Sequence, residues 1–350
     1  MFRIIFFTII IFIISIYRYS DEDQLDLLFD DSHSKTPQFE INTPTEESAN
    51  GIEERPTSGI STFIGNQIEF LVEEFGYPTR KDPTPYNFDW WIYNYDYSTY
   101  MQVGVKNNKV VSIYVIGDDI NITPFEIDQP VEEIYQTTLL GPEFALESEQ
   151  GTYRFELSEE DLNIRPLVQL DNIYVQLMID KYTSRLSSVR FYDKETLLIQ
   201  RPYELFYRGE LQHAIDEQEE LWQEIEAANA RQIFDITNVI RHRFGLKEVV
   251  WNDEIAEVAF NHSKDMAENK FFSHESESTG DLAQRLEEGG INYQTAAENI
   301  AADYVDGPAA VDGWLNSDGH RKTMLSDEYE ELGVGVFKKY YTQNFFTSLQ

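Results

Sequence analysis

Between Ile60 and about Leu198 the chain carries an internal repeat, which favours a duplicated fold. The run IGNQIEFLVEEFGYP, which begins at Ile64, resembles IDQPVEEIYQTTLLGPE, which begins at Ile127. In each run an apolar pattern of helical spacing ends at a turn that contains Gly and Pro. Each copy of the repeat is therefore predicted to begin with a short helix.

Two further stretches match each other in the same order. They are YMQVGVKNNKVVSIYVIG from Tyr100 and YVQLMIDKYTSRLSSVRFYD from Tyr174. Each is typical of two alternating strands joined by a polar turn, with Gln102 at the position of Gln176. The repeat thus predicts a duplicated α+β domain over residues 60–200.

The first copy contains an aromatic run, YNFDWWIYNYDYSTY. On one strand, Trp91, Tyr93, Tyr95 and Tyr97 would share a face. Large aromatic side chains usually serve burial, which predicts a core or interdomain position. An exposed face would instead stack on sugar rings or on a partner, and the ectodomain would then be an adhesion or signalling module.

Residues 1–20 have the composition of a targeting segment. Arg3 precedes an apolar run from Ile4 to Ile16, and Arg18 follows it. The run is shorter than the roughly 20 residues of a membrane span, yet no small-x-small cleavage site follows it. We expect an uncleaved signal anchor, and hence an extracytoplasmic protein held at the cell membrane; a cleaved signal peptide would make it a secreted one.

Residues 21–59 are predicted to be a disordered acidic linker, because they are rich in Asp, Glu, Ser, Thr and Pro and have few large apolar side chains. The formal net charge of the chain is −36, which argues against a nucleic-acid partner. The chain has no Cys, so disulfides, thiol nucleophiles and Cys-ligated zinc are excluded.

Helical spacing of apolar residues predicts a connecting helix within 201–232 and a final domain over 233–350. In that domain Asn252 is a candidate N-cap for a helix with an apolar stripe. His262 lies on the stripe, which favours a core-edge histidine with a satisfied hydrogen bond over a ligand. The runs LGVGVFKK and YTQNFFTS predict strands that end the chain in a small sheet.

Three side chains with acid/base or ligand chemistry recur in turns rich in Gly and Asn: His274, Glu298 and His320. Two imidazoles and a carboxylate brought into one cleft can share a divalent metal ion or transfer protons. They can equally bond to one another and to loop backbones without a ligand.

The succession WNDEIAEVAFNHSKDMAENKFFSH, AENIA, GWLNSDGHRKTML, LGVGV and TQNFF resembles the CAP superfamily of cysteine-rich secretory, antigen 5 and pathogenesis-related proteins. The resemblance implies an α-β-α sandwich with an open cleft, lined by two His and two Glu that can hold zinc or another divalent ion. His274, Glu298 and His320 match three of these residues. Ser317 stands at the position of the second Glu.

The missing carboxylate predicts that zinc or another divalent cation is bound weakly, since fewer anionic ligands weaken a site. No G-x-S-x-G elbow surrounds Ser317, so we expect a turn or helix-cap hydroxyl rather than a nucleophile. Asn299 is expected to bond to loop backbone and Trp314 to lie in the core.

The repeated region resembles the CAP-associated domain of membrane-anchored proteins from Bacillus-like bacteria, on the stretches FGYPTRKD, FDWWIYN and YMQVGVKNNKVVSIY. We therefore expect a protein of the Gram-positive cell surface whose cleft takes a small ligand, a divalent ion or a partner in the cell envelope without catalysis. The alternative is a divalent-metal-dependent hydrolase of the peptidase type, with Glu298 as base. The chain lacks the H-E-x-x-H spacing of many such enzymes.

Overall fold

The computed structural model describes residues 54–214 and 219–349. The predicted signal anchor (1–20) and most of the predicted linker (21–59) lie outside these ranges. Among the described residues no helix is both long and apolar enough to cross a membrane.

The described end of the linker is held against the first domain. The Arg55 guanidinium donates hydrogen bonds to Asn172 Oδ1 at 2.8 Å and to Ile64 O at 2.6 Å. The prediction of disorder is therefore wrong for this end of the linker. A single arginine that reaches two fixed acceptors offsets part of the entropy cost of ordering a polar segment.

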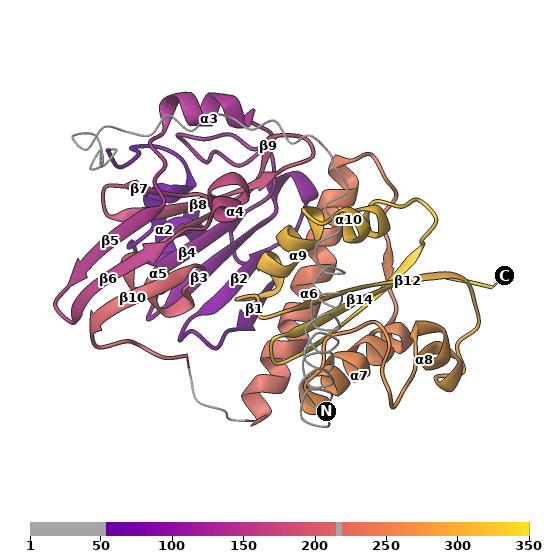
Figure 1. Cartoon of the computed structure of the whole chain (residues 1–350). Coiled ribbons are helices and arrows are strands. Elements are labelled where there is room, and N and C mark those ends of the chain that lie inside the picture. Colours follow the sequence, from indigo (N-terminus) through magenta and orange to yellow (C-terminus); the bar gives the residue numbers. More distant parts are fainter. Residues whose placement is uncertain (1–53, 215–218, 350) are drawn as a thin grey trace, which may run out of the picture. The chain divides into compact units, whose positions relative to one another are not determined.

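A seven-stranded antiparallel sheet forms the centre of the first domain (Figure 1). In chain order its strands are β1 (Arg80–Pro83), β2 (Asp89–Tyr93), β3 (Met101–Lys106), β4 (Lys109–Val115), β7 (Leu167–Leu170), β8 (Ile173–Asp180) and β9 (Arg185–Tyr192). The order across the sheet is β1-β2-β3-β4-β9-β8-β7. Two hairpins, β3–β4 and β8–β9, thus meet at the pair β4 and β9.

The pairing register shows that the two hairpins are equivalent. Gln102 lies opposite Tyr114 in the first, and Gln176 lies opposite Arg190 in the second. Where the hairpins meet, Tyr114 lies opposite Arg190. Two copies related by a two-fold axis through this pair give the same pattern, so the prediction of a duplicated α+β domain is confirmed.

The helix that opens each copy is attached to the sheet at the same point. The short helices of this domain are η1 (Ile60–Phe63), α2 (Ile68–Phe75), η2 (Tyr97–Thr99), α3 (Val131–Thr137), α4 (Glu159–Ile164) and α5 (Lys194–Gln200). Gln67, which precedes α2, pairs with Lys109 at the start of β4. Pro130, which precedes α3, pairs with Arg185 at the start of β9.

A three-stranded sheet includes residues that the sequence assigned to the connecting helix over 201–232. Its strands, in the order β10-β6-β5, are β5 (Glu143–Ser148), β6 (Gly151–Glu156) and β10 (Glu204–Gly209). Leu205 packs into the core of this sheet, whereas Phe206 is exposed, an alternation typical of a strand. The helical prediction is wrong here because pairing with β6 decides the conformation of β10.

A long helix, α6 (Glu219–Arg243), runs across the predicted boundary at residue 233. A four-stranded sheet in the order β11-β13-β14-β12 follows it. The remaining elements are β11 (Val250–Trp251), α7 (Asp253–Asn269), α8 (Leu282–Glu288), β12 (Tyr293–Ala302), α9 (Gly307–Leu315), α10 (Asp318–Met324), β13 (Glu331–Phe337) and β14 (Tyr340–Ser348). The two strands predicted at the end of the chain are thus present.

Helices cover both faces of this four-stranded sheet. Asn252 caps α7 by accepting a hydrogen bond from the backbone N–H of Ile255, as the sequence predicts. A Cβ on Gly333 or Gly335 would overlap the backbone of α7, so glycine permits the close approach of helix and sheet. The alternate residue Val334 faces the core that contains α6, which confirms the α-β-α sandwich.

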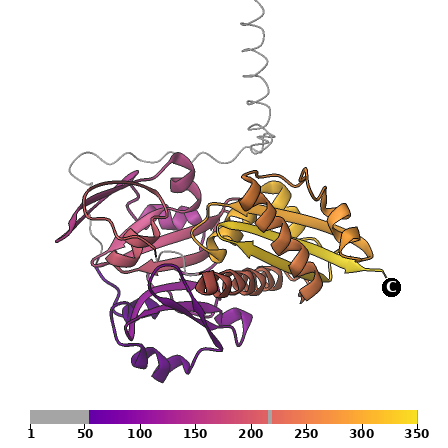
Figure 2. The same ribbon diagram turned by 90° about the horizontal axis from the view of Figure 1, so that it is seen from below.

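One hydrophobic core joins the two domains around α6, which lies between the seven-stranded sheet and the four-stranded sheet (Figure 2). This core contains Trp90 and Tyr114 from the seven-stranded sheet, Ile233 and Ile236 from α6, and Trp314 from α9. Each of these side chains is at most 2% exposed. Since α6 covers part of both sheets, the two domains depend on the same packing.

The aromatic run of the first copy is divided between strand and turn. Strand β2 ends at Tyr93, so the prediction that Tyr95 and Tyr97 continue the strand face of Trp91 and Tyr93 is wrong. The strand stops because Asp96 caps η2 by accepting from the backbone of Ser98. Tyr93 is 3% exposed and Tyr95 is 70% exposed.

The contact between the domains includes a buried ion pair on the two-fold axis of the repeat. Arg190 donates to both carboxylate oxygens of Asp306, at 2.8 and 3.0 Å. The two side chains are 0% and 6% exposed. The Arg190 guanidinium also lies over the rings of Trp90 and Tyr114, at 5.7 and 5.3 Å from their centroids. The pair therefore fixes α9 against the sheet of the first domain.

Asp312, on the same helix, is buried without a cation in direct contact. The Ser188 hydroxyl donates a hydrogen bond that is shared between the two carboxylate oxygens of Asp312, at 3.2 and 3.3 Å. Burial raises the pKa of Asp312 to about 7, although the positive charge of Arg190 and the bond from Ser188 oppose the rise. The charged form of this carboxyl is thus disfavoured at the interface.

We predict that Asp306→Asn lowers the free energy of unfolding by about 3–5 kcal/mol, because Arg190 then remains buried without its counter-ion. Asparagine can still accept the capping hydrogen bond from Ala309. Urea unfolding at neutral pH measures the effect. In the control, Asp318→Asn breaks only the exposed pair with Lys322 and should cost less than about 1 kcal/mol. Equal effects would contradict a dominant role for the buried pair.

We also predict that the difference in unfolding free energy between Asp312→Asn and the wild type depends on pH. The folded pKa lies above the ordinary value, so the native state binds the extra proton between about pH 4 and 7. The contribution of Asp312 to stability therefore falls as the pH rises through this window. Asparagine should favour the folded state more at pH 8 than at pH 5. A difference that is constant over this range would contradict the prediction.

Candidate functional site

The structure places the four predicted cleft residues on three segments of the second domain. His274 lies in the loop after α7, Glu298 on β12, and His320 in the first turn of α10. Ser317 occupies the N-cap position of α10. His274 Nδ1 is 3.0 Å from Glu298 Oε1, and His274 is close enough for its charge to affect the pKa of His320.

Asn299 and Trp314 connect the elements that carry the site. Asn299 is 1% exposed and donates to the backbone carbonyl of His320 and to Gln343 Oε1, both at 3.2 Å. The Trp314 indole donates to the carbonyl of Ile300 at 2.9 Å. These bonds hold α9 and α10 against β12, where Glu298 lies.

Glu298 is a buried carboxylate whose two oxygens are both engaged. Its side chain is 3% exposed, and Arg285 Nη2 donates to Oε2 at 2.6 Å. His274 contacts the other oxygen. Burial by itself would raise the pKa of Glu298, but the bond from His274 and the charge of Arg285 hold it below its ordinary value. Glu298 is therefore ionised at neutral pH.

Arg285 is a site residue that the sequence analysis missed. It comes from α8, and its Nη1 donates to the carbonyls of His274 and Gly280, at 3.0 and 2.7 Å. It therefore fixes both the loop of His274 and the charge of Glu298. The sequence did offer one indication of this role, because Arg285 is the only Lys or Arg between His274 and His320 and so the only cation of that segment that could pair with Glu298.

His262 lies on the buried face of α7, as its position on the apolar stripe of the sequence predicts. Its Nε2 lies 3.0 Å from the carbonyl of Ser273, which can only accept, so this nitrogen carries a proton. The same atom is 3.7 Å from Glu298 Oε1, a proximity that the sequence did not indicate. Burial lowers the pKa of His262 despite the nearby carboxylate, so the ring is neutral at neutral pH.

His320 forms a side-chain pair with Ser317. Its Nδ1 lies 2.8 Å from Ser317 Oγ. Burial, and to a smaller extent the charge of His274, lowers the pKa of His320 to about 4. Ser317 was expected to act as a turn or cap hydroxyl. It does occupy the N-cap position, but its hydroxyl bonds to the imidazole and not to the helix backbone.

The donor set fits a metal ion only in part. Within the described ranges, no three His, Cys, Asp or Glu residues are arranged to hold a metal. Glu298 pairs with Arg285, so it is not free to serve with His274 and His320 as the three expected ligands. His274 and His320 each use Nδ1 within the site, which leaves two Nε2 atoms as candidate donors. Glu298 and Ser317 would then orient the imidazoles from behind.

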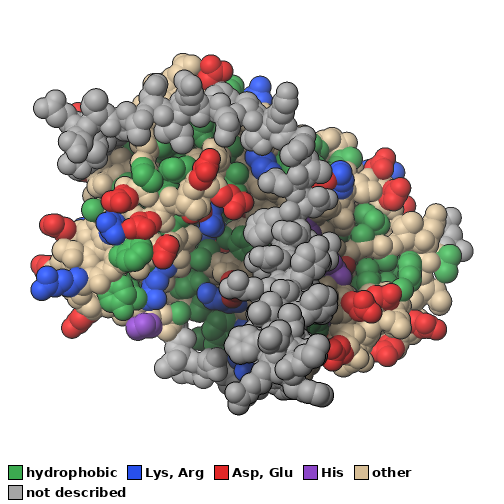
Figure 3. Space-filling model, in the orientation of Figure 1, with side chains coloured by type: hydrophobic (Ala, Val, Ile, Leu, Met, Phe, Trp, Pro, Cys, Tyr) green, Lys and Arg blue, Asp and Glu red, His purple; other side chains and the backbone are tan. Residues whose placement is uncertain are grey.

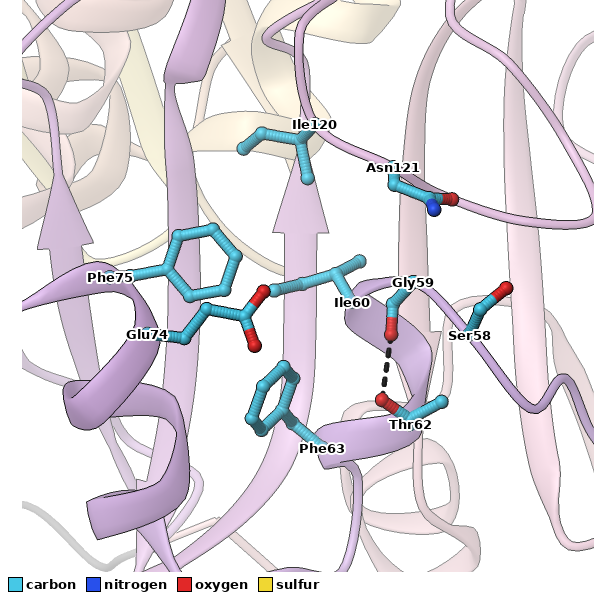
Figure 4. A pocket seen from close by; sticks show the side chains of 9 residues that line it. All are labelled: Ser58, Gly59, Ile60, Thr62, Phe63, Glu74, Phe75, Ile120 and Asn121. Carbon is cyan, nitrogen blue, oxygen red and sulfur yellow. Dashed lines mark hydrogen bonds between the residues drawn. The ribbon is translucent and has the colours of Figure 1, made fainter.

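A cavity of about 270 Å³ lies in the first domain, away from these residues. It opens between η1 and the end of α2, where Phe63 and Phe75 meet edge to face (Figure 4). Glu74 is the one ionisable side chain in its lining, and Ile60 and Ile120 form its apolar part. The predicted site does not contribute to this cavity.

Two family models match the chain. The CAP-associated N-terminal model matches residues 64–203, and the model of the cysteine-rich secretory protein family matches residues 234–350. The uncharacterized membrane protein YlbC of Bacillus subtilis is 50% identical over 290 residues, which are 83% of this chain and 84% of that protein. The protein YkwD of the same organism is 32% identical over 121 residues, 34% of this chain and 47% of that protein.

Two solved structures share the fold. One is an extracellular protein containing an SCP domain from Bacillus anthracis, with 41% identity and a TM-score of 0.79 over 87% of this chain and 100% of that one. The other is a cysteine-rich secretory protein from Staphylococcus aureus, with 28% identity and a TM-score of 0.76 over 85% of this chain and 98% of that one.

The fold and these matches define a two-domain α+β protein of the extracellular type, with an SCP domain at its C-terminal end. The chain belongs to the cysteine-rich secretory protein family, the CAP family, and carries a CAP-associated domain before the CAP domain.

We predict that Arg285→Gln lowers the unfolding free energy at pH 7 by about 3–5 kcal/mol, because a buried carboxylate loses its counter-ion. In the wild type, the pKa of Glu298 in the folded state is below its ordinary value. The ion pair therefore stabilises the folded state above about pH 4.5, and this stabilisation is lost as the pH falls through the folded pKa. The loss caused by Arg285→Gln should therefore shrink in acid.

The matched control is the double variant Arg285→Gln/Glu298→Gln, which removes both charges. It should recover part of the stability that Arg285→Gln loses at pH 7. A double variant with the summed loss of the two single variants would show that the charges do not interact.

Proposed function

We propose that this protein is held at the bacterial cell surface by its N-terminal segment and that its CAP cleft captures a small ligand or a weakly bound divalent cation without catalysis. The location is supported by two relatives: YlbC is described as a membrane protein, and the Bacillus anthracis structure is that of an extracellular protein. The apolar run from Ile4 to Ile16 supports anchoring.

The observation that carries the proposal is the orientation of the two cleft imidazoles. Glu298 is ionised and can only accept, so the Nδ1 of His274 carries a proton and its Nε2 is the nitrogen that faces a ligand. His320 stays neutral and is held through its Nδ1 by Ser317. Two rings held from behind through their Nδ1 atoms leave both Nε2 atoms to meet a cation or another small ligand.

The same geometry argues against the hydrolase alternative. A general base works best when its pKa is near the working pH. The pKa of Glu298 is lowered and both of its oxygens are engaged, which makes it a weak base. The pKa of His320 is about 4, so this ring is also poorly suited to take a proton from Ser317. We therefore favour binding over catalysis.

The surface charge limits which envelope partners fit. The chain has a formal net charge of −36, and acidic side chains are spread over both domains on the face shown in Figure 3. Long-range repulsion disfavours polyanions, so we propose a neutral or cationic partner and no nucleic acid. The aromatic run offers little for adhesion, because Trp90 and Tyr93 are buried and Tyr95 remains as an exposed ring.

We predict that Zn²⁺ binds the full-length protein and that His274→Ala and His320→Ala each weaken this binding by about 10-fold or more. Isothermal titration calorimetry at pH 7.5 measures the affinity. His213, an exposed histidine in the first domain, supplies the control His213→Ala, which should bind like the wild type. Equal affinities for all three variants would contradict the cleft assignment.

A peptide library incubated with the zinc-loaded protein separates binding from catalysis. We expect no turnover. Hydrolysis that a chelator and Glu298→Gln both abolish would favour the hydrolase alternative instead.

A further inference from the structure

The turn between β8 and β9, in the second copy of the repeat, lies against the start of α10 in the CAP domain. Asn316 Nδ2 donates to the carbonyl of Ile179, and Asn316 Oδ1 accepts from the backbone N–H of Lys181, both at 2.9 Å. Asn316 is 9% exposed. One side chain of the CAP domain thus bonds to the backbone on both sides of Asp180.

A second contact holds the same turn. Arg321 Nη1 donates to Asp180 Oδ1 at 2.9 Å, and Asp180 is 3% exposed. The Arg321 guanidinium also lies over the rings of Tyr182 and Phe244, at 4.8 and 5.1 Å from their centroids. Asp180 accepts from the backbone N–H of Tyr182 as well, so the ion pair and the shape of the turn depend on each other.

These two contacts enclose the cleft pair Ser317 and His320. Asn316 directly precedes Ser317, and Arg321 directly follows His320. From the other side, Asn299 on β12 donates to the carbonyl of His320. The first turn of α10 is therefore held between the β8–β9 turn of the first domain and the sheet of the CAP domain.

Comparison of the two copies shows that the hairpin itself does not require these contacts. The β3–β4 turn consists of Asn107 and Asn108, whereas the β8–β9 turn spans residues 181–184. Lys106 occupies the end of β3 where Asp180 ends β8. The longer turn, its acidic residue and its Tyr182 are thus specific to the copy that contacts α10.

We propose that the β8–β9 turn is a positioning element of the CAP cleft, with Asn316, Asp180 and Arg321 setting the orientation and tautomer of His320 through Ser317. The CAP-associated domain then forms part of the binding site, although it contributes no ligand atom. The proposal rests on the proposed function only in that the cleft binds a ligand. The state of His320 can be measured without one.

The test uses the full-length chain with ¹⁵N-labelled histidine, and long-range ¹H–¹⁵N spectra that report the tautomer of each ring. The His320 signals are assigned by their absence in His320→Gln. The wild type should show one His320 tautomer. In Asn316→Ala, the signals of the two His320 ring nitrogens should average, because both tautomers are then populated. The His274 signals should stay unchanged, and Zn²⁺ binding should weaken by about 5-fold or more.

Two further variants keep the test decisive. Tyr182→Ala removes a ring that is 41% exposed and should fold even where Asn316→Ala does not, with a smaller change in the same His320 signals. Lys322→Ala is the control on α10, because it removes an exposed ion pair with Asp318 and leaves the bonds of Asn316 and Arg321 to the turn in place. Its His320 signals should match the wild type.

Unchanged His320 signals in folded Asn316→Ala and Tyr182→Ala would overturn the proposal. A change of equal size in Lys322→Ala would also overturn it, since any disturbance of α10 would then suffice. Wild-type protein that binds no Zn²⁺, but whose His320 responds to Asn316→Ala, would refute zinc capture and support the positioning role.

Discussion

The packing of α6 against two sheets determines how the rest of the molecule is arranged. Ile233 and Ile236 share a core with Trp90 on one side and Trp314 on the other. Because interiors are densely packed, a helix buried in this way cannot shift against either sheet without opening voids. The buried polar groups of the contact, among them Arg190 and Asp306, therefore meet in a fixed geometry.

Two buried arginines in the described part of the chain each pair with a buried carboxylate, and their positions explain the chemistry of the cleft. Arg190 pairs with Asp306 between the domains, and Arg285 pairs with Glu298 at the site. The cost of removing such charges from water offsets much of their attraction, so the pairs add more to correct docking than to net stability. With the charge of Glu298 balanced by Arg285, the groups that remain for a ligand are the imidazoles of His274 and His320.

Internal similarity and hydrophobic periodicity were sufficient to predict the repeat, the Asn252 cap and the burial of His262. The sandwich was implied by the resemblance of the motifs to the CAP superfamily. The errors concern contacts between distant segments. Strand β10 depends on pairing with β6, about fifty residues earlier in the chain, and no local pattern records this. Arg285 lies on a short helix, where spacing alone cannot tell an exposed cation from one that neutralises a carboxylate on β12. The interdomain ion pairs were missed for the same reason.

The two-fold axis between Tyr114 and Arg190 has an evolutionary consequence. Duplication of a hairpin unit creates two equivalent surfaces, but the attached domain makes different contacts with each of them. Asp82 of the first copy accepts a hydrogen bond from Gln232 of α6, whereas Arg190 and the longer turn of the second copy contact α9 and α10. The two copies have therefore diverged around one partner, and the first also has a cavity between Phe63 and Phe75, where the aligned repeat has Glu126 and Thr138.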